Sequence, residues 1–382
     1  MKTGKKIVIF WAAIIFMFGL FLPEKKAEAA PSVNAKAYVL MEASTGRVLL
    51  EKNRDEKLPM ASTTKIMTCL LAVEKGNMDD IATIPKEAVG QEGTSIYLRE
   101  GEQVLFSDLV YGLMLASGND AAVAIAIHLA GSVENFAQMM NEKARQIGAL
   151  NSNFVTPNGL PDDNHYTTAY DLALISSYAM QNEKFCEIVG TSKMDLQQDD
   201  DSPARYLRSK NKILYQYEGG NGIKTGYTKA AGKCLSAGAK RGDMQLVAVV
   251  LNDYDMFVDC MALLDYGFEH YQMRQIAQAG QNYGEIPVEN GLEKSVPTAL
   301  RENIYLPLTE EEVTMVEEKV NMSSSLSAPV QEGEVVGFVE FSFGELTAKS
   351  EIIAAASARE STYEFHFSRV LQRWLGLEEQ AS

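Results

Sequence analysis

The sequence predicts an α+β domain followed by a small all-β domain. Apolar runs with the length of helices fill the middle of the chain, and pairs of short strand-like apolar runs flank them. Beyond about Arg274, apolar and polar residues alternate between glycine turns, which is typical of antiparallel strands. We therefore expect an antiparallel sheet with a helical cluster in residues 30–275, a β-rich domain in residues 276–358 and a helix in residues 359–382.

The first 29 residues are not expected to belong to the fold. Lysines at positions 2, 5 and 6 precede an apolar run from Ile7 to Leu22, and Ala27-Glu28-Ala29 offers small residues for cleavage. This order is typical of a secretory signal peptide, and the apolar run is short for a membrane span. An uncleaved membrane anchor is the alternative interpretation, but the cleavage site favours an exported protein.

The composition of the remaining chain restricts its partners. Without the first 29 residues the chain has 30 basic and 49 acidic side chains, a formal net charge of −19. Nucleic-acid binding is not expected, because neutralising phosphates requires a basic face. The four cysteines lack the spacing of zinc ligands, and nothing in the sequence argues for a disulfide. We expect neither a metal nor a cofactor.

The predicted elements of the first domain follow from hydrophobic periodicity and turn signals. Hairpins are expected from strands over residues 37–41 and 47–50, and from strands over 235–240 and 244–251. Helices are expected over residues 62–75, 106–130 with a break at 117–120, 133–147, 168–180 and 256–271. Residues 151–166 form a long loop, and a short strand at 223–228 follows a glycine turn. In the second domain the alternating apolar residues are Ile304, Leu306, Leu308, Val339, Phe341 and Phe343.

The chain is organised around the stretch Ser62-Thr63-Thr64-Lys65, which begins an apolar helix that Gly76 ends. Residues three apart share a helix face, so the amine of Lys65 can reach the hydroxyl of Ser62. A hydroxyl becomes a strong nucleophile when a neighbouring base takes its proton. Lysine can act as that base if burial or nearby positive charge lowers its pKa.

Three short motifs occur in order along the chain. They are Ser62-x-x-Lys65 at a helix start, Ser117-Gly118-Asn119 at a break between helices, and Lys224-Thr225-Gly226 on a strand after a glycine turn. Each short pattern also occurs elsewhere by chance, and Ser209-Lys210-Asn211-Lys212 repeats the first two in a polar stretch. Only the first set has all three motifs in order and in sensible structural context.

This trio is known from penicillin-binding proteins and class A β-lactamases. Further matches are LMLASGNDAAVA at 113–124, TPNGL at 156–160 and HYTTAYD at 165–171. With them the chain resembles the low-molecular-mass penicillin-binding proteins, specifically the serine D-alanyl-D-alanine carboxypeptidases. The resemblance is close over residues 35–271 and looser over residues 327–356.

The resemblance implies a peptidoglycan stem peptide ending in D-Ala-D-Ala as substrate and β-lactams as covalent inhibitors. Ser62 would attack the penultimate carbonyl, and Lys65 would accept the serine proton. Ser117 would relay a proton to the leaving amine, and Asn119 would bind the substrate amide and Lys65. Water would then hydrolyse the acyl-enzyme formed on Ser62.

The resemblance assigns the third motif to substrate binding. Lys224 would lower the pKa of Lys65 and attract the terminal carboxylate, helped by the hydroxyl of Thr225. Gly226 would leave room for the substrate along the strand edge. The backbone N–H groups of Ser62 and Tyr227 would form the oxyanion hole.

The sequence departs from the family in one respect. Many relatives carry an arginine shortly after the strand that matches residues 244–251, where it helps to hold the substrate carboxylate. Here residues 252–256 contain no basic residue, so strict carboxypeptidase rather than endopeptidase action is less certain. His165 lies near Asp162 and Asp163, which could suggest a metal site. We expect instead a solvated loop residue that hydrogen-bonds within the fold, since two adjacent acids and one histidine define no metal geometry.

Two other functions were weighed. A β-lactamase of class A needs a glutamate in the loop before the third motif, and residues 151–171 contain none. A catalytically silent wall-binding or penicillin-sensing module would be marked by the loss of Ser62 or Lys65, and both are present. The carboxypeptidase interpretation is therefore favoured.

The C-terminal segment has an amphipathic helical pattern. Its apolar residues at helical spacing are Tyr363, Phe367, Val370, Leu371, Trp374 and Leu377. Arg369 and Arg373 fall on the other face, and residues 354–358 have the composition of a linker. We expect the helix to lie in the interface of the cytoplasmic membrane, on its outer face. A helix that packs on the β-rich domain is the alternative.

Overall fold

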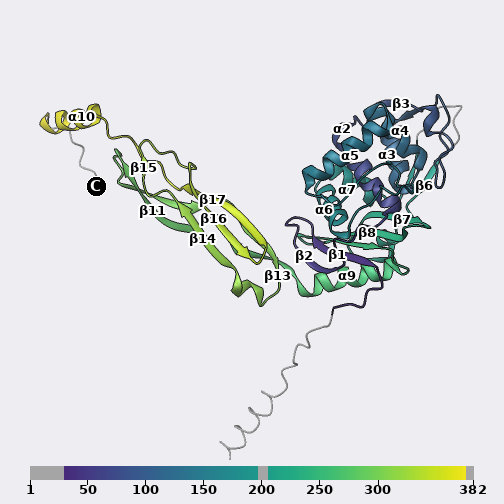
Figure 1. The fold of residues 1–382 in the computed structure, drawn as a ribbon. Helices are drawn as coiled ribbons and strands as arrows, with labels where there is room; N and C mark the ends of the chain where they lie inside the picture. Colours follow the sequence, from purple (N-terminus) through teal and green to yellow (C-terminus); the bar gives the residue numbers. More distant parts are fainter. Residues whose placement is uncertain (1–29, 197–204, 376–382) are drawn as a thin grey trace, which may run out of the picture. The chain divides into compact units, whose positions relative to one another are not determined.

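The computed structural model of the chain describes residues 30–196 and 205–375 (Figure 1). The expected signal peptide and the end of the C-terminal amphipathic segment, Leu377 included, lie outside these residues. Within the described part, no helix has the length and apolar character that crossing a bilayer requires.

A five-stranded antiparallel sheet, ordered β2-β1-β9-β8-β7, frames the first domain. Its strands are β1 (Ala37–Glu42), β2 (Val48–Lys52), β7 (Gly220–Thr228), β8 (Gly232–Arg241) and β9 (Met244–Leu251). Both predicted hairpins are confirmed, since β1 pairs with β2 and β8 pairs with β9. The early strand β1 also pairs with β9, and β7 is left at the edge of the sheet.

Both faces of this sheet are covered. On one face of β9, Leu246, Ala248 and Val250 share a core with helix α9 (Met256–His270). On the other face, Val247, Val249 and Leu251 share a core with the helical cluster. This explains why the sequence of β9 is apolar from Leu246 to Leu251, because a strand buried on both sides has no polar face.

The helices over the other face follow the predicted order. They are α2 (Lys65–Lys75), α3 (Phe106–Leu115), α4 (Asn119–Ala130), α5 (Val133–Ile147), α6 (Ala169–Ala179) and α7 (Glu183–Gly190). Shorter elements connect them: η1 (Ala61–Thr64), β3 (Ile81–Thr83), η2 (Lys86–Ala88), β4 (Gln103–Leu105), β5 (Lys193–Asp195), β6 (Tyr206–Arg208) and α8 (Ile213–Gln216). The break at 117–120 is confirmed as the boundary between α3 and α4, whereas α7 was not predicted.

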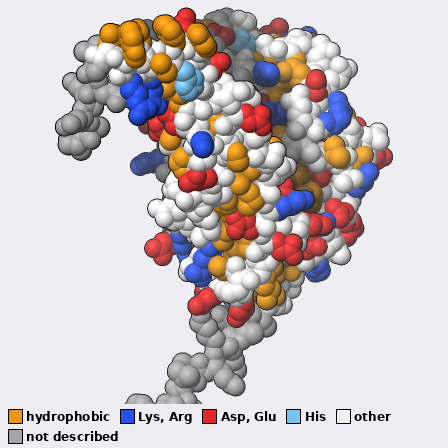
Figure 2. All heavy atoms as spheres, turned by 90° about the vertical axis from the view of Figure 1, so that its left-hand side faces the viewer, with side chains coloured by type: hydrophobic (Ala, Val, Ile, Leu, Met, Phe, Trp, Pro, Cys, Tyr) orange, Lys and Arg blue, Asp and Glu red, His pale blue; other side chains and the backbone are white. Residues whose placement is uncertain are grey.

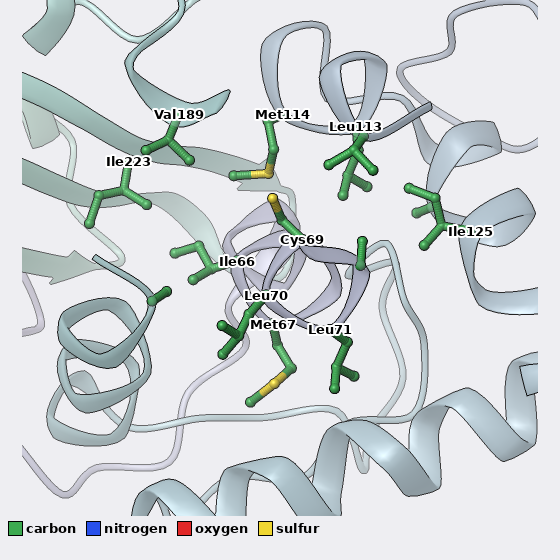
Figure 3. Packing of buried hydrophobic residues seen from close by; sticks show 14 of the residues in the cluster. Ile66, Met67, Cys69, Leu70, Leu71, Leu113, Met114, Ile125, Val189 and Ile223 are labelled. Atoms are coloured by element: carbon green, nitrogen blue, oxygen red, sulfur yellow. The ribbon is translucent and has the colours of Figure 1, made fainter. Parts of the chain in front are cut away.

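Helix α2 runs through the centre of this cluster, and all its residues from Lys65 to Ala72 are buried. Figure 3 shows its side chains pointing in different directions into the core, with Cys69 directed toward Met114 of α3. A helix surrounded in this way needs apolar residues on every face, as its sequence provides. The helix ends at Gly76, where the backbone becomes extended, and a Cβ there would lie 2.3 Å from the ring of Phe106.

The C-terminal part is all-β, as predicted. Its elements are β10 (Gln272–Ala277), β11 (Asn282–Glu289), β12 (Ser295–Leu300), β13 (Ile304–Leu308), η3 (Glu312–Met315), β14 (Glu317–Met322), β15 (Leu326–Ser327), β16 (Val335–Phe343) and β17 (Leu346–Ala354). Six strands form one sheet, ordered β14-β16-β17-β12-β11-β15, and β10 pairs with β13. The alternation is confirmed, since Ile304, Leu306, Val339 and Phe341 are buried in its core.

The expectation of a linker at residues 354–358 was wrong. Ala354 and Ala358 are buried in the β-domain core, and Ala358 exchanges backbone hydrogen bonds with Val330. Small residues fit because the segment packs into the core rather than crossing solvent. After it comes helix α10 (Tyr363–Trp374), which confirms the predicted helical segment.

Candidate active site

Ser62 lies in η1, a single 3-10 turn that leads directly into α2. The preceding residue, Ala61, has a φ of 49°, a left-handed conformation that is costly for a non-glycine residue. This turn places Ser62, half-buried, in the wall of a cleft of about 730 Å³. The same cleft is lined by Ser117, Asn119 and Thr225, so all three predicted motifs meet there.

Lys65 is completely buried next to the cleft. Its Nζ lies 2.9 Å from Oγ of Ser62. The same nitrogen lies 2.7 Å from Oδ1 of Asn119 and 2.8 Å from the carbonyl oxygen of Asn158. The contact with Asn119 was expected. The carbonyl of Asn158 was not, because a backbone oxygen leaves no signature in a sequence.

The pKa of Lys65 is held well below its ordinary value. Burial is the largest cause, the charge of Lys224 adds to it, and the charge of Asp120 acts in the opposite direction. A neutral amine has two N–H donors and one lone pair, and the two neighbouring carbonyl oxygens can take both donors. The lone pair then faces the hydroxyl of Ser62, so the amine is placed to accept its proton.

The second motif occupies the break between α3 and α4. Ser117 has a left-handed φ of 62°, and its carbonyl accepts a hydrogen bond from Oγ1 of Thr94. The N–H of Asn119 donates to the carbonyl of Thr94 at 2.7 Å. The carboxylate of Asp120 accepts hydrogen bonds from the N–H groups of Ile96 and Leu98. A neighbouring loop thus fixes Ser117 and Asn119 in the cleft wall.

The third motif lies on the edge strand β7. Lys224 is buried, and its Nζ donates to the carbonyl of Thr225 at 3.0 Å. Burial, with a contribution from the charge of Lys210, lowers the pKa of Lys224 to about 7. An arriving carboxylate would favour the charged form of this lysine. Lys224 can therefore change its charge in response to a neighbouring anion.

Gly226 brings β7 against the turn that carries Ser62. A Cβ at this position would lie 3.0 Å from the backbone nitrogen of Ser62 and 3.1 Å from the carbonyl oxygen of Met60. Glycine is therefore needed at this position for close packing against η1, and not only for the substrate space that the sequence predicted. Tyr227 follows with an exposed side chain, and the outer edge of β7 lies along the cleft.

Lys210 is a cleft residue that the sequence interpretation missed. The residues after β9 contribute Met256 and Phe257 to the cleft but no cation, in agreement with the missing arginine. Lys210 lines the same cleft together with Thr225 and Ser117, so it supplies a positive charge near the expected position of the carboxylate. The sequence Ser209-Lys210-Asn211 gives little local indication of this position, because the short pattern also occurs by chance.

His165 is a loop residue that hydrogen-bonds within the fold, as expected, but the expectation that it is solvated was wrong, because this side chain is buried. Its Nε2 lies 2.8 Å from Oγ1 of Thr64, and its Nδ1 accepts the N–H of Val155. Burial lowers its pKa to about 4. Among residues 30–196 and 205–375, no cluster of histidine, cysteine or acidic side chains has the arrangement of a metal site, and the four cysteines are unpaired.

A helical cluster on an antiparallel sheet, with a serine and a buried lysine at their junction, defines the penicillin-binding class of serine acyl-transfer proteins. Residues 24–255 match the D-alanyl-D-alanine carboxypeptidase family, and residues 271–360 match the penicillin-binding protein 5 C-terminal domain. The chain therefore belongs to the D-alanyl-D-alanine carboxypeptidase family.

Individual relatives agree with this assignment. The chain is 34% identical over 351 residues to D-alanyl-D-alanine carboxypeptidase DacF of Bacillus subtilis (strain 168), covering 89% of this chain and 90% of that protein. It is 31% identical over 359 residues to DacC of Escherichia coli (strain K12), covering 89% and 87%. The crystal structure of penicillin binding protein 5 from Haemophilus influenzae matches with a TM-score of 0.72 and 28% identity, covering 87% of this chain and 99% of that one.

Proposed function

We propose that this protein is a serine-type D-alanyl-D-alanine carboxypeptidase that removes the terminal D-alanine from peptidoglycan stem peptides. The central observation is the pair formed by Ser62 and the buried Lys65, whose reacting atoms are 2.9 Å apart. Family membership supports the choice of substrate. The free edge of β7 beside this pair can align an extended peptide through backbone hydrogen bonds.

Acylation begins when Oγ of Ser62 attacks the penultimate carbonyl carbon and its proton passes to Nζ of Lys65. The negative charge that develops on the carbonyl oxygen is stabilised by the N–H groups of Ser62 and Tyr227, each such donor typically contributing about 3 kcal/mol. The C–N bond then breaks, and Ser117 relays the proton held by Lys65 to the departing amine of D-alanine, which leaves Lys65 neutral again. The product is an ester on Ser62.

In deacylation water is the attacking group, and Oγ of Ser62 is the leaving group. Water attacks the ester carbonyl and loses a proton to the restored neutral amine of Lys65, and Oγ of Ser62 leaves and regains a proton. Throughout, Asn119 fixes the orientation of Lys65 through the 2.7 Å contact. Lys224 and Thr225 hold the carboxylate of the substrate until D-alanine departs.

Two experiments test this function. The purified protein should release free D-alanine from a peptide that ends in D-Ala-D-Ala. After treatment with penicillin, mass spectrometry of proteolytic fragments should place the adduct on the peptide that contains Ser62. A folded protein that forms no adduct, or forms it on Ser209, would contradict the proposal.

We also propose that α10 attaches the protein to the outer face of the cytoplasmic membrane. The apolar side chains of this helix are exposed, with Tyr363 and Trp374 each 82% accessible. Figure 2 shows a row of hydrophobic side chains at the top of the view, with basic side chains beside it. A helix with this pattern buries its apolar face in the lipid interface. The two arginines add little electrostatic attraction, so the attachment is reversible.

This attachment can be measured by sedimentation with liposomes. The protein lacking its signal peptide should sediment with vesicles, and deletion of residues 361–382 should release it. D-Alanine release from a soluble peptide should stay unchanged in the deletion variant. Failure of the undeleted protein to sediment would instead favour a helix that packs on the β-domain.

A further inference from the structure

The peptide unit between Ala61 and Ser62 carries two groups of interest. Its N–H belongs to Ser62 and is the proposed oxyanion-hole donor, and its C=O belongs to Ala61. Because a peptide unit is planar, the direction of its C=O fixes the direction of its N–H. Whatever holds the carbonyl of Ala61 therefore also aims the N–H of Ser62.

The carbonyl of Ala61 is held by a hydrogen bond and by close packing. Oγ1 of Thr64 donates to it at 2.8 Å, and Nε2 of His165 lies 2.8 Å from the same Oγ1. Thr64 is completely buried. Gly159 packs so closely that a Cβ on it would lie 2.0 Å from the oxygen of Ala61. The left-handed φ of 49° at Ala61 is thus maintained by specific contacts.

The direction of these hydrogen bonds is determined by the imidazole. Its Nδ1 lies 3.0 Å from the N–H of Val155 and 3.3 Å from that of Thr156, and both can only donate. Nδ1 must therefore be the acceptor, and Nε2 carries the proton. The pKa of about 4 keeps the ring neutral at ordinary pH. Nε2–H of His165 therefore donates to Oγ1 of Thr64, and the hydroxyl of Thr64 donates to the carbonyl of Ala61.

We propose that His165, acting through Thr64, is a positioning residue that aims the N–H of Ser62 at the oxyanion. The hydrogen-bonded chain also polarises the peptide unit, because each bond strengthens the next in a low-dielectric interior. Oxyanion donors act mainly in the transition state. Loss of the chain should therefore slow acylation much more than it weakens substrate binding. The inference rests on the proposed function, since it needs Ser62 to be the nucleophile.

The first test removes one hydroxyl. Thr64→Val keeps the shape of the side chain but cannot bond to Ala61. The matched control is Thr68→Val in the adjoining helix α2, because Thr68 is equally buried and its hydroxyl donates to the carbonyl of Pro157 instead. Thr64→Val should slow penicillin acylation about 10-fold to 100-fold, since losing a whole oxyanion donor costs about 100-fold to 1,000-fold. Thr68→Val should stay within about threefold of the unmutated protein, although both variants lose a comparable hydrogen bond.

The second test separates the two nitrogens of His165. In His165→Gln the amide can reach Thr64 and donate as Nε2 does, whereas in His165→Asn the shorter amide can only replace Nδ1 toward Val155. We expect the Gln variant to recover most of the acylation rate and the Asn variant to resemble Thr64→Val. For hydrolysis of a D-Ala-D-Ala peptide, kcat should fall in the Asn variant while KM changes less than about threefold.

Melting temperatures of all four variants show whether each is folded. If Thr64→Val and Thr68→Val acylate equally fast, or if Gln and Asn at position 165 are equivalent, His165 serves only the stability of the loop and the inference is wrong. Absence of acylation in the unmutated protein would overturn the proposed function instead, so the two failures are distinguishable. In the ¹⁵N spectrum, with only four histidines in the chain, a proton on Nδ1 of His165 would also contradict the inference.

Discussion

The spacing Ser-x-x-Lys occurs at residues 62–65 and again at residues 209–212, and the two copies have different environments. In the first copy the lysine is fully buried with its amine 2.9 Å from the serine hydroxyl. In the second copy Lys212 is exposed, and its amine lies over the ring of Phe257. Ser209 accepts a backbone N–H from Asn211 instead of contacting a lysine.

Burial, rather than the Ser-x-x-Lys spacing alone, enables a lysine to act as a base. An exposed lysine is solvated and stays protonated, so it cannot accept a proton from serine. Burial of Lys65 destabilises its charged form, and the buried Lys224 adds positive potential. The second copy has a different use, because Lys210 within it lines the cleft near the expected carboxylate position.

The largest effect is expected from removing the nucleophile. Ser62→Ala should abolish penicillin acylation and lower D-alanine release by about 1,000-fold or more, as for other serine enzymes that lose their nucleophile. Ser209→Ala should change neither rate by more than about twofold. Steady-state kinetics and intact-protein mass spectrometry measure both. Equal losses of activity in the two variants would show that the two Ser-x-x-Lys copies do not differ in function.

The next prediction concerns the base. Lys65→Ala should slow acylation about 100-fold to 10,000-fold, the usual contribution of a positioned proton acceptor. Lys65→Arg should do no better, because a guanidinium stays protonated. Lys212→Arg is the matched control in the second copy, and it should leave the acylation rate unchanged. Rapid acylation of the Lys65→Arg variant would mean that the site needs positive charge rather than a base.

A smaller effect is expected in the pH profile. Lys224 has a lowered pKa of about 7, so its charge is present below pH 7 and is lost as pH rises through this value. For a substrate with a free terminal carboxylate, kcat/KM should therefore fall above about pH 7. A substrate with an amide in place of that carboxylate should lack this alkaline decrease. A decrease of the same size for both substrates would assign it to another group.

The smallest effect is expected at Lys210. Lys210→Ala should raise KM for a carboxylate substrate about threefold to tenfold, with less effect in high salt, because this lysine is exposed. Its charge lowers the pKa of Lys224, so its removal should move the alkaline decrease to higher pH. Lys212→Ala should do neither. A KM equal to that of the unmutated protein would leave Lys224 as the main carboxylate partner.

The sequence predicted most elements because their local signals agree with their tertiary surroundings. The hairpin of β8 and β9 has a tight turn between apolar runs, and the helices of the cluster have long apolar faces. Helix α7 was missed because it is short, and a helix of eight residues is marginal by itself. Burial of Phe185, Ile188 and Val189 in the core stabilises it, but an apolar pattern this short does not by itself identify a helix.

The sequence by itself determined the three motifs, their order and the family, because side-chain chemistry at fixed spacing is written in the chain. Only the tertiary structure decided that Lys65 is buried and Lys212 exposed, since burial depends on residues far apart in sequence. It also decided three placements that the motifs did not predict: the carbonyl of Asn158 at Lys65, Lys210 at the cleft and His165 at Thr64. Backbone oxygens and loop residues acquire such roles only when folding brings them within hydrogen-bonding distance.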